Sequence, residues 1–228
     1  MKNKIFVKKN IPNILLVVRM LLVPAIVGLL IADYFCESGN PLIYSLFSPF
    51  NRESTYTHIH LFFLIAGILF VIAAITDWLD GRIARKYNWV SNFGKFWDPV
   101  ADKVLINSVL ICFAAATIVP IYIPIITIIR DVIVDAQRMT ASKKDIVVAA
   151  NYWGKLKTIL QMVGIIFIMF FFNAPYFNDV VNEPAYQGIY WGVQNLFLHL
   201  ATIMSVVSGI VYFTGINRKM RNQHGKQN

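Results

Sequence analysis

The chain contains few charged residues for its length. Asp, Glu, Lys and Arg make up 14% of its 228 residues, whereas a soluble domain of this size usually carries about 25%. Hydrophobic residues make up 57%, and the mean hydropathy is +0.58. This composition excludes an ordinary soluble domain. Several apolar runs reach the roughly 20 residues that a membrane-spanning helix needs, so the sequence predicts a polytopic helical membrane protein.

Cysteine is also scarce. Cys36 and Cys112 are far apart, and the second lies within an apolar run. Neither a disulfide framework nor a cysteine metal site follows from such a pair. His58 and His60 lie together without a carboxylate partner, which is typical of ordinary loop residues. The chain also lacks internal repeats of 20–50 residues and low-complexity tracts.

Basic residues outnumber acidic ones, with 21 Lys and Arg against 12 Asp and Glu and a net charge of +9. No recognition motif for nucleic acid accompanies this charge, so we expect no nucleic-acid partner. Basic residues at the ends of membrane spans meet anionic lipid on the cytoplasmic side. The basic segment 1–13 precedes a long apolar run without a small-residue cleavage site, which favours a first span over a cleaved signal peptide.

Six apolar segments are expected to span the membrane: 14–33, 61–84, 98–118, 119–141, 154–174 and 189–216. The third and fourth are separated by a weak break near Pro120 and Pro124, where we expect a tight turn. If the N-terminus is cytoplasmic, the outer connections 34–60, 117–124 and 173–188 contain one basic residue, Arg52. This asymmetry follows the positive-inside rule.

The expected fold is therefore an all-α integral membrane protein of six transmembrane helices with cytoplasmic N- and C-termini. Residues 14–216 form the membrane domain, with 34–60 as its one sizeable outer loop. Residues 1–13 and 217–228 form basic cytoplasmic ends.

Four aspartates lie in the stretch TDWLDGRIARKYNWVSNFGKFWDPVADK, residues 76–103. At the helical rise per residue, Asp77 and Asp80 lie roughly 24 Å and 28 Å along the second span. Asp98 and Asp102 lie in the first turns of the third span. All four are thus expected at one level near the cytoplasmic interface, and the i,i+3 and i,i+4 spacings put each pair on one helical face.

Clustered carboxylates repel one another, and each costs on the order of 2.5–3.5 kcal/mol at the centre of a span. Divalent cations compensate this cost, and oxygen ligands suit Mg²⁺ or Mn²⁺. Two helices that each offer two carboxylates could hold two ions roughly 3.5–4 Å apart and clamp a diphosphate between them. The alternative is that the acids solvate helix ends or pair with neighbouring Lys and Arg side chains, which explains one acid better than four.

Small residues between the aspartates leave room for a ligand. Gly81 would let a ligand approach the backbone, Ala84 keeps the same face narrow, and Gly94 opens the turn before the third span. The arrangement indicates a nucleotide-diphosphate pocket.

The pattern Asp77-x2-Asp80-Gly81-x2-Ala84-Arg85-x8-Gly94-x3-Asp98-x3-Asp102 resembles the signature of the CDP-alcohol phosphatidyltransferases at every position. The resemblance implies a six-helix, usually homodimeric membrane enzyme that transfers a phosphatidyl group from a CDP-linked lipid to an alcohol and releases CMP. It implies metal ligation by all four aspartates, with Asp102 also acting as general base on the acceptor hydroxyl.

The same resemblance implies how the CDP-linked lipid is bound. The residues expected to contact it are Asn13, Asp80, Gly81, Ala84, Arg85, Ser91 and Gly94. Arg19, on the first span, is a further candidate at the diphosphate. Its alternative is a side chain that reaches back to the inner headgroups.

Three stretches resemble the bacterial phosphatidylglycerophosphate synthases in particular: 10–24, 76–103 and 128–162. This resemblance implies CDP-diacylglycerol and sn-glycerol 3-phosphate as substrates. Two positions depart from that group, since Asp131 follows Arg130 where glutamate is usual, and Leu16 stands where threonine is common.

A basic cluster supports a phosphorylated acceptor. Arg130 lies inside an apolar span, and an intramembrane arginine indicates a functional site; its alternative is a simple pair with Asp131 or Asp135. The residues expected to bind the acceptor phosphate are Arg130, Arg138, Lys155 and Lys157. Lys155 and Lys157 are two apart and cannot share one helical face, and we favour Lys155.

The sequence thus predicts a multi-pass enzyme of the bacterial plasma (inner) membrane, with its active site facing the cytoplasm. The expected partners are CDP-diacylglycerol, glycerol 3-phosphate and membrane lipids, and the family resemblance implies a second copy of the chain. Alternatives are a cardiolipin synthase of this fold, a synthase acting on another phosphorylated polyol, or a divalent-cation transporter. Transport sites tend to lie near the midplane between repeated halves, which disfavours the transporter.

Overall fold

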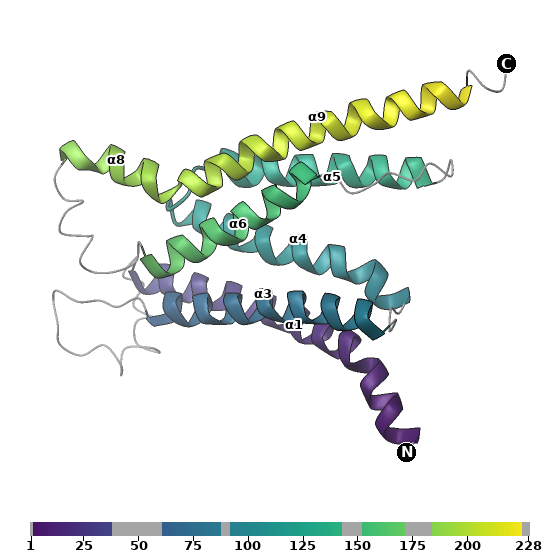
Figure 1. Cartoon of the computed structure of the whole chain (residues 1–228). Helices are drawn as coiled ribbons and strands as arrows, with labels where there is room; N and C mark the ends of the chain where they lie inside the picture. Colours follow the sequence, from purple (N-terminus) through teal and green to yellow (C-terminus); the bar gives the residue numbers. More distant parts are fainter. Residues whose placement is uncertain (1, 38–60, 88–91, 143–151, 172–183, 225–228) are drawn as a thin grey trace.

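The computed structural model describes residues 2–37, 61–87, 92–142, 152–171 and 184–224. These residues form helices, and the described connections between helices are 116–121 and Asn195 (Figure 1). The helices are α1 (Lys2–Glu37), α3 (Leu61–Tyr87), α4 (Asn92–Ala115), α5 (Tyr122–Ser142), α6 (Tyr152–Phe171), α8 (Pro184–Gln194) and α9 (Leu196–His224). The all-α prediction is confirmed for this part of the chain. The last predicted segment is divided between α8 and α9.

Four helices contain a stretch long and apolar enough to cross a membrane. These stretches are Ile14–Asp33, Phe62–Leu79, Tyr152–Phe170 and Leu196–Ile216, in α1, α3, α6 and α9. Charged residues interrupt the apolar sequence of α4 and α5, so neither helix joins this set. The expected tight turn between those two helices lies at 116–121, where Thr117 has a φ of 59°.

The helices pack as two groups of three. α1 lies against α3 and α4, whereas α9 lies against α5 and α6. Contacts of α3 with α6, and of α4 with α5 and α6, join the two groups. The start of α1 and the end of α9 lie at the same end of the bundle (Figure 1).

Apolar side chains fill the space between the groups. Phe63 of α3 stacks on Phe113 of α4 with ring centroids 5.6 Å apart, and both belong to a buried cluster shared by α1, α3, α4, α5, α6 and α9. Close packing of this kind, helped by small residues, holds helices together in lipid. A Cβ on Gly67 would lie 3.2 Å from the Met169 Cβ, so this glycine lets α3 approach α6.

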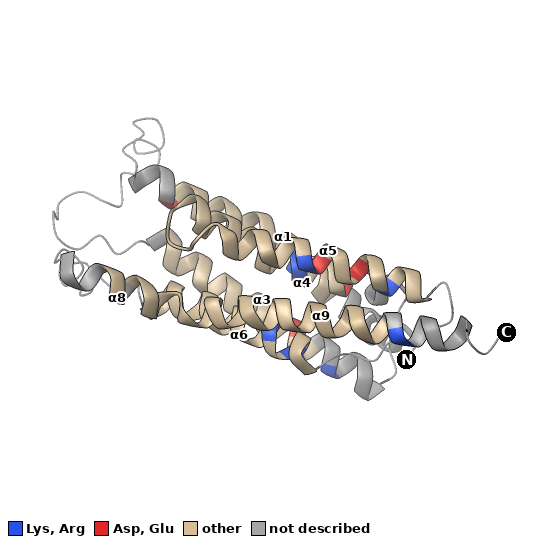
Figure 2. Cartoon of the chain, turned by 90° about the horizontal axis from the view of Figure 1, so that it is seen from above, with Lys and Arg blue, Asp and Glu red and all other residues tan. Residues whose placement is uncertain are grey.

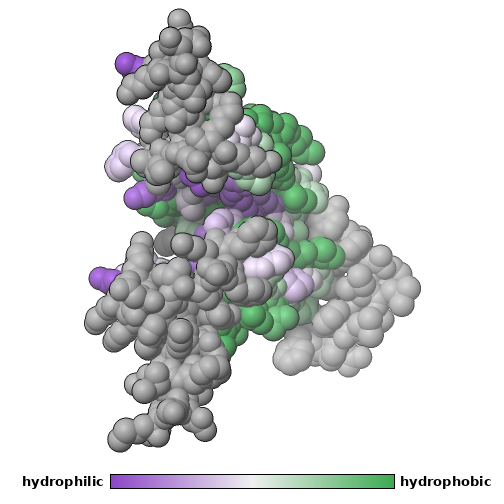
Figure 3. Space-filling model, turned by 90° about the vertical axis from the view of Figure 1, so that its right-hand side faces the viewer, coloured by the Kyte–Doolittle hydropathy of each residue, from purple (hydrophilic) through white to green (hydrophobic). Residues whose placement is uncertain are grey.

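Charged residues gather in the half of the bundle that holds the N- and C-terminal ends of the chain (Figure 2). The opposite half is almost entirely uncharged among the residues described. Viewed onto the charged end, hydrophilic surface lies in the middle and at the left, and hydrophobic surface lies mainly at the right (Figure 3). Polar residues therefore gather on part of this end of a largely apolar bundle.

Gly164→Ala tests the packing of α6 on α9. An added Cβ would lie 2.8 Å from the Leu198 Cδ2, and overpacking of this kind costs about 1–3 kcal/mol. We expect a lower midpoint of thermal unfolding in detergent. Gly28→Ala is the control, because nothing lies within 4 Å of its added Cβ. Equal midpoints for the two variants would show that the α6–α9 contact is looser than described.

Candidate active site

Arg19 connects three helices at the charged end of the bundle. Its side chain has no exposed surface, and its Nη1 lies 2.6 Å from the Asp77 Oδ1 and 2.7 Å from the Asp102 Oδ1. These acids belong to α3 and α4, while Arg19 belongs to α1. The alternative in which Arg19 reaches the headgroups is therefore wrong, because two inward-facing carboxylates hold the guanidinium inside the bundle.

The apolar sequence of each helix explains why these side chains meet. Asp77 follows the long apolar run of α3, and Asp102 lies one turn beyond Asp98 near the start of α4. The carboxylates of Asp77 and Asp102 are about a third exposed, at 30% and 34%. The side chain of Asp98 is half-buried. The predicted meeting of acids from α3 and α4 is thus seen for Asp77 and Asp102.

Other predicted residues of this region lie outside the part of the chain whose side chains are described. These are Asn13, Asp80, Gly81, Ala84, Arg85, Ser91 and Gly94. Their predicted contacts with the CDP-linked lipid stay predictions.

The described acids fit a divalent cation by their chemistry and their convergence. Carboxylate oxygens are the ligands that Mg²⁺ and Mn²⁺ prefer, and the Oδ1 atoms of Asp77 and Asp102 are close enough to contact one common nitrogen. A group of three potential ligands is not found among the described side chains. Asp80, the fourth member of the predicted set, is not among those side chains.

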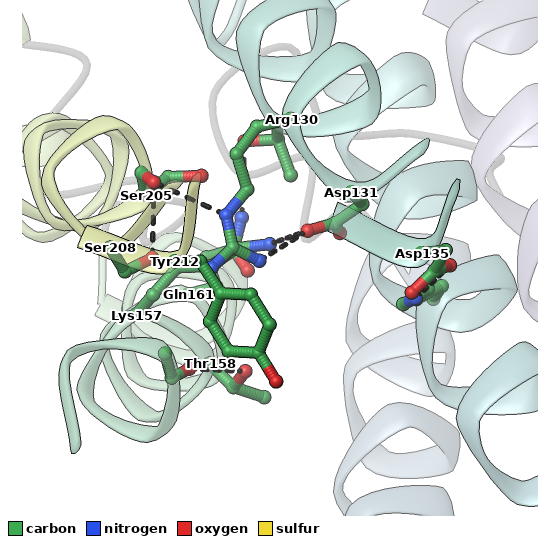
Figure 4. A network of polar contacts seen from close by, with 12 residues as sticks. Arg130, Asp131, Asp135, Lys157, Thr158, Gln161, Ser205, Ser208 and Tyr212 are labelled. Atoms are coloured by element: carbon green, nitrogen blue, oxygen red, sulfur yellow. Dashed lines mark hydrogen bonds and ion pairs between the residues drawn. The ribbon is translucent and has the colours of Figure 1, made fainter. Parts of the chain in front are cut away.

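A second polar cluster lies in the other group of helices (Figure 4). Asp131 of α5 accepts from the Lys157 Nζ of α6 at 2.6 Å and from the Arg130 Nη1 at 3.0 Å. Lys157 and Asp131 are 4% and 7% exposed. Two cations thus share one acid in the interior, which leaves the three groups with a net positive charge.

Helix α9 contributes further partners to this cluster. The Arg130 Nε donates to the carbonyl oxygen of Ser205 at 3.2 Å, and the Arg130 Nη2 donates to the Ser208 hydroxyl. The Arg138 Nε donates to the Tyr212 hydroxyl at 3.0 Å, with the guanidinium carbon 5.1 Å from the ring centroid. Both arginines of α5 are therefore held against α9.

The two lysines of α6 lie on different faces. Lys157 is buried beside Asp131, whereas Lys155 is exposed. Gln161, one turn beyond Lys157, is also buried and donates to the Thr127 hydroxyl of α5 at 3.2 Å. We expected Lys155 rather than Lys157 to lie beside Arg130, and this expectation is wrong. The face of α6 that carries Lys157 and Gln161 packs toward α5, so Lys157 is the lysine that lies in the cluster with Arg130.

One ion pair joins the two clusters. The Lys103 Nζ of α4 pairs with the Asp135 Oδ2 of α5. Lys103 directly follows Asp102, and Asp135 lies one turn beyond Asp131. The acidic site and the basic cluster consequently lie on adjoining helices at the same end of the bundle.

Ser205, Ser208 and Tyr212 were not expected from the sequence. They follow one another at helical spacings of three and four within an apolar run, and all three are buried. That spacing was the available signal, since polar residues on one stripe of a membrane helix face its neighbours.

Comparison with known proteins gives consistent matches over most of the chain. Residues 9–207 match the model of the CDP-alcohol phosphatidyltransferase family. A CDP-diacylglycerol–glycerol-3-phosphate 3-phosphatidyltransferase of Mycoplasma genitalium is 38% identical over 96% of this chain and 89% of its own. Proteins of the same name from Mycoplasma pneumoniae and Bacillus subtilis are 36% and 33% identical, over 94% and 90% of this chain and 90% and 94% of their own.

Arg19→Gln tests the bridge between α1, α3 and α4. Removing one partner of a buried ion pair leaves the others uncompensated and costs about 3–5 kcal/mol; the partial exposure of both acids favours the lower end of that range. We expect a markedly lower midpoint of thermal unfolding in chelator-treated detergent buffer. Arg218→Gln is the matched control, since Arg218 is exposed on α9. A loss no larger than in this control would contradict the bridge.

Proposed function

Because the chain belongs to the CDP-alcohol phosphatidyltransferase family, we propose that it transfers the phosphatidyl group of CDP-diacylglycerol to sn-glycerol 3-phosphate. The products are phosphatidylglycerophosphate and CMP, and the reaction serves phosphatidylglycerol and cardiolipin synthesis. The relatives that bear the corresponding name are similar along most of the chain. The observation that carries the acceptor assignment is that two cations, the half-buried Arg130 and the buried Lys157, share one acid.

The charge of this cluster matches a phosphate monoester. Asp131 neutralises one of its two neighbouring cations, and Arg138 adds a third on the same helix, two turns on. Placing Arg130 and Lys157 beside a single acid in a largely apolar bundle is costly unless an anion completes the site. An uncharged alcohol would not require it. A cardiolipin synthase of this fold is the second candidate, but its acceptor is a phosphodiester and brings less charge.

In the proposed reaction, the acceptor hydroxyl attacks the β-phosphorus of CDP-diacylglycerol. Asp102 takes the hydroxyl proton as the new P–O bond forms, and the bond to the CMP oxygen breaks. Arg19 holds the Oδ1 of Asp102 at 2.7 Å and so fixes the orientation of this carboxylate. Mg²⁺ or Mn²⁺, as two ions held by Asp77, Asp80, Asp98 and Asp102, would neutralise the diphosphate.

Arg130, Lys157 and Arg138 then hold the phosphate of the acceptor, with Lys155 nearer the surface. Binding of the phosphate would orient the acceptor hydroxyl toward Asp102. It would thereby lower the entropic cost of bringing the hydroxyl and the base together. The Lys103–Asp135 pair joins the two helices that carry the base and the phosphate ligands. Asn13, Gly81, Ala84, Arg85, Ser91 and Gly94 are assigned to the CDP-linked lipid.

We also propose that all six long helices cross the membrane, with both termini and the active site on the cytoplasmic side of the plasma membrane. α4 and α5 contain 24 and 21 residues, which correspond to roughly 36 Å and 32 Å. Both lengths suffice to cross the hydrocarbon core. The basic residues at the charged end follow the positive-inside rule. A homodimer in the membrane completes the proposal.

The reaction is tested with purified protein in detergent, CDP-diacylglycerol, Mg²⁺ and radiolabelled glycerol 3-phosphate. We expect label in lipid and stoichiometric CMP release. Chelation should abolish both, and Mg²⁺ or Mn²⁺ should restore them. Asp102→Asn should lower kcat by about 10²–10⁴, the usual contribution of a general base, whereas Asp33→Asn at the far end of α1 keeps its activity. Transfer only to another alcohol would overturn the acceptor, and no CMP with any alcohol would overturn the reaction.

The two lysines of α6 provide a direct test of the acceptor site. Lys157→Met should raise the KM for glycerol 3-phosphate by about 10- to 100-fold, since a hydrogen bond to a charged group is lost. The KM for CDP-diacylglycerol should change little. Lys155→Met, two residues away and exposed, should have a much smaller effect. The reverse order would place the acceptor phosphate on the outer face of α6.

A further inference from the structure

We propose that Ser208 and Gly209 of α9 are positioning residues, which aim the Arg130 guanidinium at the phosphate of the acceptor. This inference rests on the proposed function, because it takes Arg130 as a phosphate ligand. It assigns a role to a helix that carries no part of the aspartate signature.

The hydrogen bonds of Arg130 fix the plane of its guanidinium (Figure 4). The Nε and Nη2 atoms form one edge of the group, and both donate to α9, to the Ser205 carbonyl oxygen at 3.2 Å and to the Ser208 hydroxyl. The Nη1 donates to the Asp131 Oδ1 at 3.0 Å. Two helices thus hold the guanidinium from different sides.

Ser208 is oriented for this contact. Its own hydroxyl proton goes to the Ser205 carbonyl oxygen at 3.1 Å. A hydroxyl has one donor and two acceptor lone pairs, so the Ser208 oxygen is left to accept from Arg130. The Ser205 carbonyl oxygen therefore accepts hydrogen bonds from both Ser208 and Arg130, and this holds the two side chains together.

The contacts leave part of the guanidinium for a ligand. Arginine has five N–H donors, and the three bonds use one each on Nε, Nη1 and Nη2. One N–H remains on each terminal nitrogen. Both are charged donors that a phosphate oxygen can accept from, and fixing the guanidinium fixes the directions in which they point.

Glycines on two helices make room for the Arg130 side chain. A Cβ on Gly209 of α9 would lie 3.3 Å from the Arg130 Cγ, and a Cβ on Gly154 of α6 would lie 3.7 Å from its Nη2. The first distance is tight, so a methyl group on Gly209 would displace the arginine by a few tenths of an ångström. Such a shift changes the direction of the terminal nitrogens without unfolding the helix.

The packing of α5 on α9 does not depend on Ser208. Val134 and Ala141 of α5 form a separate buried cluster with Tyr212 and Ile216 of α9. Removing the Ser208 hydroxyl therefore leaves this apolar contact in place. Its effect falls on the orientation of Arg130, which distinguishes a positioning role from a structural one.

The test compares Ser208→Ala with Thr202→Val in the assay with glycerol 3-phosphate. Thr202 is also buried on α9, but its hydroxyl donates to the Leu198 carbonyl oxygen of its own helix. We expect Ser208→Ala to raise the KM for glycerol 3-phosphate by about three- to tenfold, the value of one hydrogen bond. The KM for CDP-diacylglycerol should be the same in the two variants. Their midpoints of thermal unfolding should differ by no more than a few degrees. Ser208→Thr, which keeps a hydroxyl, should restore most of the affinity.

Gly209→Ala provides a second variant that acts on the same arginine by a different route. It should raise the KM for glycerol 3-phosphate in the same way, whereas Gly215→Ala should not, because nothing lies within 4 Å of its added Cβ. If the wild-type protein transfers nothing to glycerol 3-phosphate, the proposed function fails and this inference with it. If the wild type is active but Ser208→Ala and Gly209→Ala match their controls, this inference alone is overturned.

Discussion

A charged side chain inside an apolar helix bundle must be paired, and this requirement governs the structure. Each unpaired charge at the centre of a span costs on the order of 2.5–3.5 kcal/mol. Arg19 meets the requirement with Asp77 and Asp102, and Lys157 meets it with Asp131. Because every partner comes from a different helix, these pairs determine which helices are neighbours and how each is rotated.

The acidic and the basic clusters lie in different groups of helices. α1, α3 and α4 carry the acidic site, and α5, α6 and α9 carry the cations. The Lys103–Asp135 pair lies where the groups adjoin, next in sequence to the proposed base. The proposed transfer requires a nucleotide-linked lipid and a phosphorylated alcohol to meet, and under that proposal each would bind on its own side of this boundary.

The sequence was sufficient for most of the helices and for the meeting of Asp77 with Asp102, because apolar length and helical spacing are local properties. It was not sufficient for the rotation of each helix about its own axis. Lys155 and Lys157 lie on different faces of α6, and which of these faces packs on α5 depends on the neighbouring helices. Ser205 and Ser208 lie in an apolar run of α9 that carries little amphipathic pattern, so only the helical spacing of these few polar residues marks the face that meets Arg130.

The Arg19 bridge has a consequence for the biogenesis of the protein. Asp102, one of its partners, follows 83 residues later in the chain. Until Asp77 has been synthesised, the first helix holds an arginine without its acidic partners, at a cost that part of its apolar length must offset. Because α3 and α4 each supply one of the two acids, the complete bridge forms only after both helices have been synthesised.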